Sequence, residues 1–162
     1  MLIKFQSYTT LLIIPFLITG PLIPELLLIL SSIIFLYNSY NKKDFSFIFN
    51  RYNFLFLLVC CYFVIRSLLS NHIYLSLESS LFYFRFIFLA SSISFLALYE
   101  KLFLKHLFLV IAFSFVIIFL DGAYQYLRGY DIFGYPYDGY RLRSLFGYDK
   151  IMGSYLVRLL PL

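Results

Sequence analysis

Residues 107–127 read LFLVIAFSFVIIFLDGAYQYL, and this apolar run decides the class of fold. A helix that crosses the hydrocarbon core of a bilayer needs about 20 predominantly apolar residues, and this run is long enough. Over the whole chain, hydrophobic residues make up 62% and charged residues 13%, with a mean hydropathy of +0.88. Soluble domains carry about 25% charged residues. We therefore expect an all-α integral membrane protein, a polytopic bundle of transmembrane helices.

Four further apolar runs precede this one, and a sixth opens after it. The five predicted spans are residues 5–20, 21–40, 54–70, 79–99 and 107–127, followed by a loop at 128–150. The first run is short and meets the second at Gly20–Pro21, which predicts a tight hairpin. Residues 151–162 correspond to about 18 Å of helix, less than the ~30 Å of the hydrocarbon core. They are therefore expected to be the start of an incomplete sixth span.

The loops predict the orientation of these spans. The positive-inside rule places Lys- and Arg-bearing loops in the cytoplasm. The rule applies to the N-terminus, to the loop after 21–40 and to the loop after 79–99, which carry Lys4, Lys42, Lys43, Arg51, Lys101 and Lys105. The segment 71–77 has neither Lys nor Arg and is expected to face outward, which places the loop 128–150 outside as well.

The loop 128–150 is basic although it is predicted to face outward. It carries Arg128, Arg141, Arg143 and Lys150, partly balanced by Asp131, Asp138 and Asp149, and it is rich in Gly and Tyr. Because such a cluster works against the positive-inside rule, an anionic ligand explains it better than membrane insertion does. The alternative is an interfacial loop that lies on the lipid head groups.

Ionisable side chains inside the predicted spans form a second group. Counted from the outer span ends, Arg66 lies about 6 Å deep, Arg85 and Asp121 about 9 Å, and Arg158 about 10 Å. Such residues are expensive in a membrane and usually functional. The alternatives to a functional role are that Arg66 snorkels to the head groups and that Arg85 and Asp121 form a structural ion pair.

Asp121, Gln125 and Arg128 also share one helical face, at i, i+4 and i+7. Arginine stays charged and binds phosphate oxygens in bidentate fashion, so this set favours a phosphate or pyrophosphate attached to a lipid. The predicted substrate-binding residues are Arg85, Asp121, Gln125, Arg128, Arg143 and Arg158.

The remaining composition argues against other classes of site. The net charge is +5, but the cations lie between apolar runs, which favours membrane lipids as partners and not nucleic acid. Cys60 and Cys61 are adjacent, which fits neither a disulfide framework nor a zinc spacing. His72 and His106 stand alone in predicted loops, so no metal and no cofactor is expected.

The end of the chain resembles the O-antigen ligase and polymerase family. The similar elements are Asp121, Gln125 and Gly129 at spacings of four, then Asp131-Ile-Phe-Gly134, Arg141-Leu, Phe146-Gly147 and Gly153-Ser-Tyr-Leu. The short opening hairpin and Tyr83-Phe-Arg85-Phe are also similar. The resemblance covers about the last forty residues of the chain.

The resemblance implies a polytopic bacterial inner-membrane glycosyltransferase of the GT-C type, with the loop 128–150 in the periplasm. Such enzymes move a glycan from an undecaprenyl-diphosphate carrier to lipid A–core or to a growing polysaccharide, without a metal. On this pattern Arg141 binds the diphosphate.

Two departures from the family pattern leave a second class of function open. Ser144 stands where the family usually has Gly, and Arg143 adds a second charge. The family also continues through further spans and a large loop that bears another arginine and the proposed histidine base. The chain is therefore expected to be an N-terminal part, inactive alone. The alternative is a small non-catalytic membrane protein, such as a lipid-binding protein, a transporter subunit or a decayed remnant.

Overall fold

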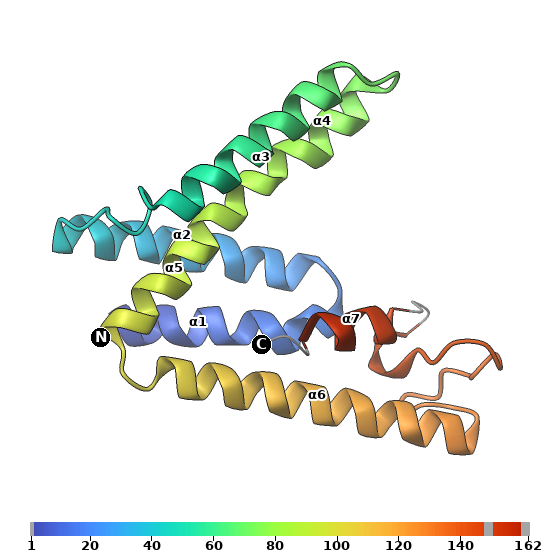
Figure 1. Cartoon of the computed structure of the whole chain (residues 1–162). Helices are drawn as coiled ribbons and strands as arrows, with labels where there is room; N and C mark the ends of the chain where they lie inside the picture. Colours follow the sequence, from blue (N-terminus) through green and yellow to red (C-terminus); the bar gives the residue numbers. More distant parts are fainter. Residues whose placement is uncertain (1, 148–150, 160–162) are drawn as a thin grey trace. The chain divides into compact units, whose positions relative to one another are not determined.

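The computed structural model describes residues 2–147 and 151–159, and over these residues the fold is built from helices without a strand (Figure 1). An isolated bridge joins Tyr130 and Pro136. The elements are α1 (Leu2–Phe16), η1 (Leu17–Thr19), α2 (Leu22–Lys42), α3 (Arg51–Leu68), α4 (Ile73–Leu81), η2 (Phe82–Phe84), α5 (Arg85–Tyr99), α6 (Phe103–Arg128), η3 (Ser144–Phe146) and α7 (Met152–Leu159).

Four helical segments are long and apolar enough to cross a membrane, which confirms the predicted membrane-protein class. They are α2, α3, the continuous segment Ile73–Tyr99, and α6. The first helix, α1, is shorter. It ends before Gly20, whose φ of 105° lies in the region that favours glycine, and α2 follows after Pro21. The two helices run antiparallel on either side of this break (Figure 1).

The third of these long segments begins at Ile73, six residues before the predicted start of the span at 79. Serine hydroxyls bond back to the helix: Ser79 Oγ donates to the Leu75 carbonyl and Ser80 Oγ to the Leu77 carbonyl, both at 3.2 Å. These bonds satisfy polar side chains inside an apolar helix, a possibility that a count of apolar residues overlooks.

The earlier start changes the position of Arg85 along its helix. Arg85 lies twelve residues after Ile73, or about 18 Å along the helix, whereas Arg66 lies two residues before the end of α3, or about 3 Å. The two arginines therefore lie at different distances from the turn of this hairpin. Their depths in the membrane stay predictions.

The chain forms two compact units. Unit 1 holds the residues up to Thr10 and Leu26–Lys101, and unit 2 holds Leu11–Glu25 and the residues from Leu102 onward. In unit 1, the buried rings of Phe35 and Phe95 meet edge to face with centroids 5.6 Å apart. Lys42 Nζ lies 3.4 Å above the centroid of the Tyr99 ring.

Unit 1 also contains a buried set of polar side chains that we call the helix network: Gln6, Thr10, Ser31, Asn38 and Ser92. Gln6 Nε2 donates to Ser92 Oγ, and Asn38 Nδ2 donates to Gln6 Oε1, both at 2.8 Å. The hydroxyls of Thr10 and Ser31 lie 2.7 Å apart, and those of Ser31 and Ser92 3.1 Å apart. These bonds join α1, α2 and α5 to one another, as interhelical polar contacts do in membranes.

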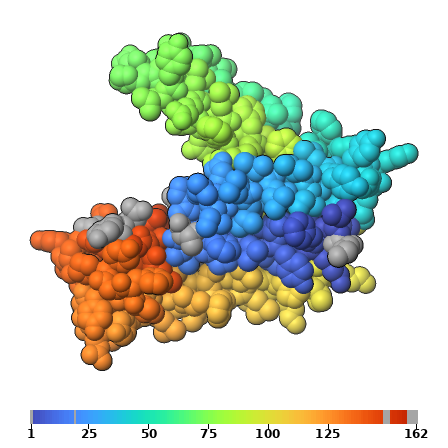
Figure 2. Space-filling model, turned by 180° about the vertical axis from the view of Figure 1, so that it is seen from behind, coloured from blue at the N-terminus to red at the C-terminus, as the bar shows by residue number. Residues whose placement is uncertain are grey.

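Unit 2 has its own apolar core at the buried side chains of Ile118, Phe146 and Met152. Gly122 on α6 lets the Met152 side chain of α7 approach its backbone, because a Cβ at this position would overlap that side chain. Tyr155 on α7 donates to the Ile14 carbonyl at 2.9 Å. Figure 2 shows the end of α6 and the segment after it as one continuous packed mass in orange.

Candidate functional site

The segment after α6 turns back sharply onto the end of that helix. Gly129 follows the last helical residue with a φ of 81°, and its N–H bonds to the Gln125 carbonyl at 2.9 Å, a common way to end a helix. The Tyr137 N–H then donates to the Gly129 carbonyl at 2.8 Å. Arg128, at the end of α6, is exposed. The turn returns the chain to the buried face of α6.

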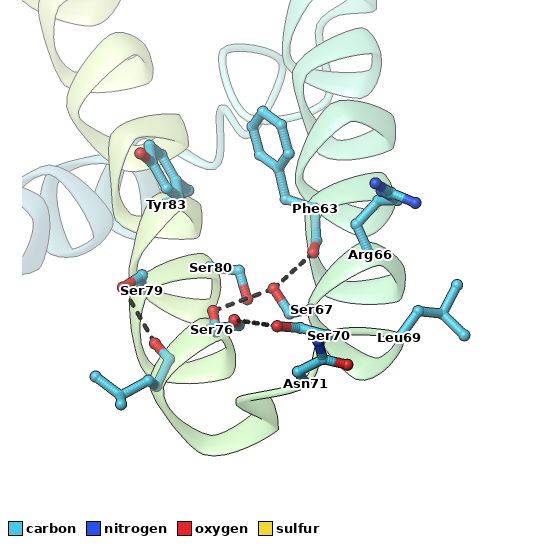
Figure 3. Close-up of a pocket in the computed structure, with 11 residues that line it drawn as sticks. Phe63, Arg66, Ser67, Leu69, Ser70, Asn71, Ser76, Ser79, Ser80 and Tyr83 are labelled. Atoms are coloured by element: carbon cyan, nitrogen blue, oxygen red, sulfur yellow. Dashed lines mark hydrogen bonds between the residues drawn. The ribbon is translucent and has the colours of Figure 1, made fainter.

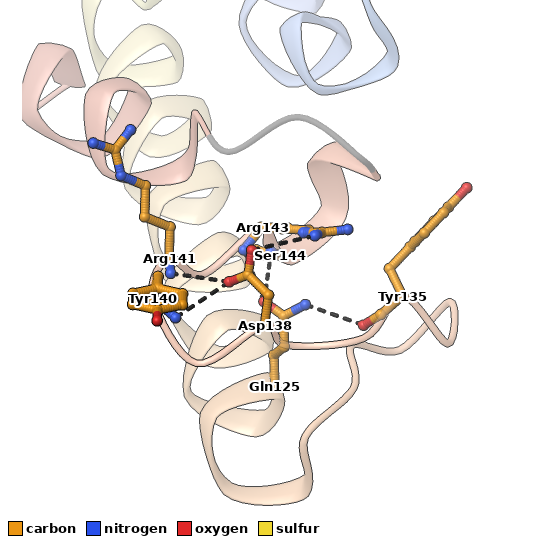
Figure 4. A network of polar contacts seen from close by, with 7 residues as sticks. All are labelled: Gln125, Tyr135, Asp138, Tyr140, Arg141, Arg143 and Ser144. Carbon is orange, nitrogen blue, oxygen red and sulfur yellow. Dashed lines mark hydrogen bonds and ion pairs between the residues drawn. The ribbon is translucent and has the colours of Figure 1, made fainter.

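Gln125 is the residue that holds this segment in place. Its side chain is fully buried, and its Nε2 donates to the Tyr135 carbonyl at 3.1 Å. Its Oε1 accepts from the backbone N–H groups of Arg143 and Ser144, at 2.8 and 3.0 Å (Figure 4). One amide therefore satisfies three backbone groups from two separate parts of the loop.

Asp121, one turn earlier on the same face of α6, is 1% exposed and binds the loop in the same way. Its Oδ1 accepts from the Ile132 N–H at 3.1 Å, and its Oδ2 accepts from Ser144 Oγ at 2.7 Å. Asp121 and Gln125 thus lie beneath the loop and fix its position.

Ser144 has a backbone conformation that favours glycine. Its φ is 51°, and a side chain at such an angle costs about 1–2 kcal/mol. Its hydroxyl lies within bonding distance of the Ile118 carbonyl, at 3.1 Å, as well as of Asp121. These contacts offset the strain.

Asp138 organises the part of the loop that bears the arginines. Its Oδ1 accepts from the backbone N–H groups of Tyr140 and Arg141, at 3.2 and 3.3 Å. Its Oδ2 pairs with Arg143 Nη2 at 3.4 Å. Arg143 Nε is buried and has no hydrogen-bond partner among the described residues. We call Asp121, Gln125, Asp138, Arg143 and Ser144 the loop cluster.

A cavity of about 620 Å³ lies between this loop and α7. Its walls carry one charged residue, Arg141, together with three phenol rings and smaller side chains: Tyr126, Tyr137, Tyr140, Leu142, Met152, Gly153, Ser154 and Leu156. Arg141 is exposed, and its side chain is directed away from the Asp138–Arg143 pair (Figure 4). No acidic side chain pairs with it within residues 2–147 and 151–159. The cavity therefore presents an unneutralised cation beside aromatic rings.

Two pairs of tyrosine rings connect α6 to the loop. The centroids of Tyr124 and Tyr130 lie 6.0 Å apart, and those of Tyr126 and Tyr137 6.1 Å apart. A hydrogen bond with Tyr124 is the main cause that raises the pKa of Tyr130 above its ordinary value of 10.0. This phenol is therefore neutral at physiological pH and can donate or accept a hydrogen bond.

The structure brings together some of the predicted site residues and not others. Asp121, Gln125 and Arg143 belong to the loop cluster. Arg85 belongs to unit 1, where its guanidinium lies 5.5 Å from the Phe82 ring and 5.3 Å from the Phe86 ring. Arg158 lies in α7, but its side chain, like residues 148–150 with Lys150, is outside the described part. The substrate-binding role predicted for these residues stays a prediction.

Sequence reasoning did not single out Asp138 or the three cavity tyrosines. Asp138-Gly139 is a dipeptide that commonly marks a turn, so the sequence could have placed Asp138 in a turn. It could not have predicted the bond between Asp138 and Arg143. The tyrosines were recognised only as interfacial residues. Comparisons with protein-family models, curated proteins and solved structures find no match for this chain.

Proposed function

We propose that this chain is a membrane protein whose loop after α6 binds the diphosphate of a lipid-linked glycan, with Arg141 as the principal phosphate ligand. The observation that carries the proposal is the position of Arg141: exposed, on a cavity wall, and held through its own backbone N–H by Asp138. A fixed backbone with an extended guanidinium suits bidentate recognition of phosphate oxygens.

The walls of the cavity support a glycan as the group next to the phosphate. Ligand sites combine apolar and aromatic surface with a few polar groups that fix orientation. The rings of Tyr126, Tyr137 and Tyr140 supply flat apolar surface with a hydroxyl at the edge, which suits the mixed polar and apolar faces of a sugar.

Arg143 is the second cation of the site, and its charge is held by Asp138. A diphosphate that enters beside Arg141 offers a second phosphate group, and Arg143 Nε is a buried donor that still lacks an acceptor among the described residues. Arg143 does not line the cavity, and in this proposal it is the candidate for the second phosphate next to the cavity wall, while Asp121 and Gln125 keep the loop in position.

The larger role that we propose follows the family resemblance. The chain serves in a bacterial inner-membrane ligase that moves the glycan from undecaprenyl diphosphate to lipid A–core or to a growing polysaccharide. The N-terminus lies in the cytoplasm, and the loop 128–150 lies in the periplasm. The four long apolar helices support the membrane location.

Binding tests the site directly. The whole chain is reconstituted in neutral-lipid nanodiscs and titrated with undecaprenyl diphosphate, undecaprenyl monophosphate and undecaprenol. Arg141→Gln is expected to weaken diphosphate binding by about tenfold or more, because a hydrogen bond to a charged group contributes about 1.5–3 kcal/mol. The control is Lys105→Gln, an exposed cation near the other end of α6. Equal affinities of these two variants would remove Arg141 from the site.

Two further experiments test the finer statements. An alkaline phosphatase fused at Gly139 is expected to be active, and an inactive fusion would overturn the periplasmic location of the loop. Glycan transfer is measured in cells in which this chain is the one variable component. Diphosphate binding without any effect on transfer would favour the non-catalytic alternative.

A further inference from the structure

A second cavity, of about 790 Å³, lies in unit 1, in the hairpin formed by α3 and α4 (Figure 3). Figure 1 shows these two helices side by side, joined by a short turn. The lining is mostly polar and consists of Phe63, Arg66, Ser67, Leu69, Ser70, Asn71, Leu75, Ser76, Ser79, Ser80 and Tyr83. None of these residues takes part in the loop cluster.

The cavity has a polar end and an aromatic end. At the turn, Ser76 Oγ donates to Ser70 Oγ at 3.0 Å, and Ser67 Oγ lies 3.1 Å from the Ser76 carbonyl, so that the hairpin is closed by hydroxyls. At the other end, the rings of Phe63 and Tyr83 lie with centroids 5.6 Å apart. Figure 3 shows these two rings above the serines, one on each helix.

Four of the five serines that line the cavity use their protons within the hairpin; the fifth, Ser70, accepts from Ser76 Oγ and from the His72 N–H. Ser79 and Ser80 donate to backbone carbonyls of α4, Ser67 donates to carbonyls of the hairpin, and Ser76 donates to Ser70. A hydroxyl has one proton and two lone pairs, so these oxygens remain acceptors. A ligand that satisfies them must bring donors, and several hydroxyl groups in one small molecule are such donors.

The positive charge of the cavity indicates that the ligand also carries an anionic group. Among the described residues that line the cavity, Arg66 alone is charged, and it lies on the α3 flank of the hairpin (Figure 3). Within the described part of the chain no carboxylate pairs with it. A lone cation one turn from the end of an apolar helix is stabilised by an anion at the membrane surface.

We propose that this α3–α4 cavity binds an anionic polyol head group, one phosphate joined to a hydroxyl-bearing carbon skeleton, as in the head group of phosphatidylglycerol. Arg66 binds the phosphate, the serine oxygens accept from the hydroxyls, and the Phe63–Tyr83 end packs on the carbon skeleton. The proposal does not depend on the Arg141 site.

The test measures lipid retention by native mass spectrometry of the whole chain in phosphatidylcholine nanodiscs that contain one added lipid. Phosphatidylglycerol is expected to be retained about tenfold more than phosphatidylethanolamine, because both offer a phosphate to Arg66 but the ethanolamine ammonium is repelled by that arginine, whereas the glycerol hydroxyls find acceptors. Phosphatidic acid, which has the phosphate without the glycerol hydroxyls, is expected to be retained less than phosphatidylglycerol. Equal retention of phosphatidylglycerol and phosphatidic acid would overturn the polyol assignment.

Variants locate the binding. Arg66→Gln is expected to abolish the preference for phosphatidylglycerol, and Arg51→Gln, on the same helix, to leave it intact. Equal effects of the two substitutions would overturn the site. Ser80→Ala, which removes the hydroxyl acceptor and adds no bulk, is expected to lower retention of phosphatidylglycerol to the level of phosphatidic acid. In a competition experiment, free glycerol 3-phosphate is added to the lipid-bound protein. Displacement of phosphatidylglycerol by this compound would identify a soluble ligand, whereas unchanged retention of phosphatidylglycerol would identify the lipid.

Discussion

The two units use buried polar side chains in different ways. The helix network of unit 1 joins side chain to side chain, between α1, α2 and α5. The loop cluster of unit 2 joins side chains of α6 to backbone N–H groups and carbonyls of the loop, at Ile132, Tyr135, Arg143 and Ser144. The first arrangement fixes how helices pack, and the second fixes an irregular segment that bears arginines.

The difference teaches which polar residues of a membrane protein control a site. A side chain that pairs with another side chain can be replaced together with its partner by apolar groups at little cost. A side chain that satisfies backbone groups has no such substitute, because the backbone groups remain when the side chain is removed. Function is therefore expected to depend more strongly on the loop cluster than on the helix network.

The largest expected difference between the two units comes from removing one glutamine side-chain amide from each. Gln125→Leu leaves the N–H groups of Arg143 and Ser144 without their acceptor, at about 1–3 kcal/mol for each group that stays buried, while the Tyr135 carbonyl keeps its bond from the Asp131 N–H. We expect the loop to detach, with loss of amide-exchange protection at Arg143 and Ser144 and loss of diphosphate binding.

The matched control is Gln6→Leu in the helix network, which removes two side-chain bonds. We expect it to weaken helix packing in unit 1 while the exchange protection of the loop stays unchanged. Both variants are measured by hydrogen exchange in the same detergent. Loss of loop protection in the Gln6 variant, or retention of it in the Gln125 variant, would contradict the division of roles.

A smaller effect is expected at Ser144, where strain and hydrogen bonds oppose each other. Ser144→Ala keeps the positive φ and loses the bonds to Asp121 and Ile118, whereas Ser144→Gly loses the same bonds but removes the strain. Ser144→Ala should therefore be less stable than Ser144→Gly by about 1 kcal/mol, measured as the free energy of unfolding. Equal stabilities would mean that the left-handed backbone at Ser144 carries no strain.

Variants of Asp138 separate two roles of this residue in the loop cluster, its charge beside Arg143 and its hydrogen bonds to the backbone. Asp138→Asn keeps an oxygen for the N–H groups of Tyr140 and Arg141 but removes the charge opposite Arg143. Since a partly exposed ion pair contributes about 0.2–1 kcal/mol, the freed arginine should raise diphosphate affinity up to about fivefold. Asp138→Ala, which also releases the backbone of Arg141, should lower the affinity. A titration in which both variants gain affinity would argue against backbone positioning by Asp138.

The smallest expected effect is the pH dependence of Asp44, between α2 and α3. A hydrogen bond from the Ser46 hydroxyl is the main cause that lowers the pKa of Asp44 below its ordinary value of 3.8. The unfolded state therefore takes up the proton first, and the stabilisation is complete above about pH 3.8 and lost as the pH falls through the lower folded pKa. The difference in unfolding midpoint between wild type and Asp44→Asn should shrink below that pH. A difference that stays constant down to pH 2 would contradict the assignment.

Much of the helical fold could be predicted from the sequence because apolar runs of sufficient length have one structural outcome in a membrane. The break at Gly20–Pro21 and the end of α6 before Gly129 also follow from local chemistry. The start at Ile73 did not follow, because Ser79 and Ser80 read as polar while their hydroxyls are satisfied by the helix itself.

The candidate site was predicted less completely. The spacing of Asp121 and Gln125 places them on one face of α6, which is local information. What that face binds depends on Ile132, Tyr135 and Ser144, which lie later in the chain. The path of an irregular loop that brings them back to α6 cannot be predicted from the spacing of apolar and polar residues. For the same reason Asp121 and Gln125 were expected to contact substrate, whereas the structure gives their polar atoms backbone and hydroxyl partners inside the fold.

The burial of Asp121 has a consequence for the order in which the protein assembles. Its two described donors, the Ile132 N–H and the Ser144 hydroxyl, lie 11 and 23 residues later in the chain. Because the ribosomal exit tunnel encloses the most recently made residues, Asp121 reaches the membrane before either donor has left the ribosome. Until the loop folds back, water, a lipid head group or a proton must satisfy that carboxylate. Docking of the loop is thus the step that completes the insertion of α6, and it assembles the arginine-bearing surface at the same moment.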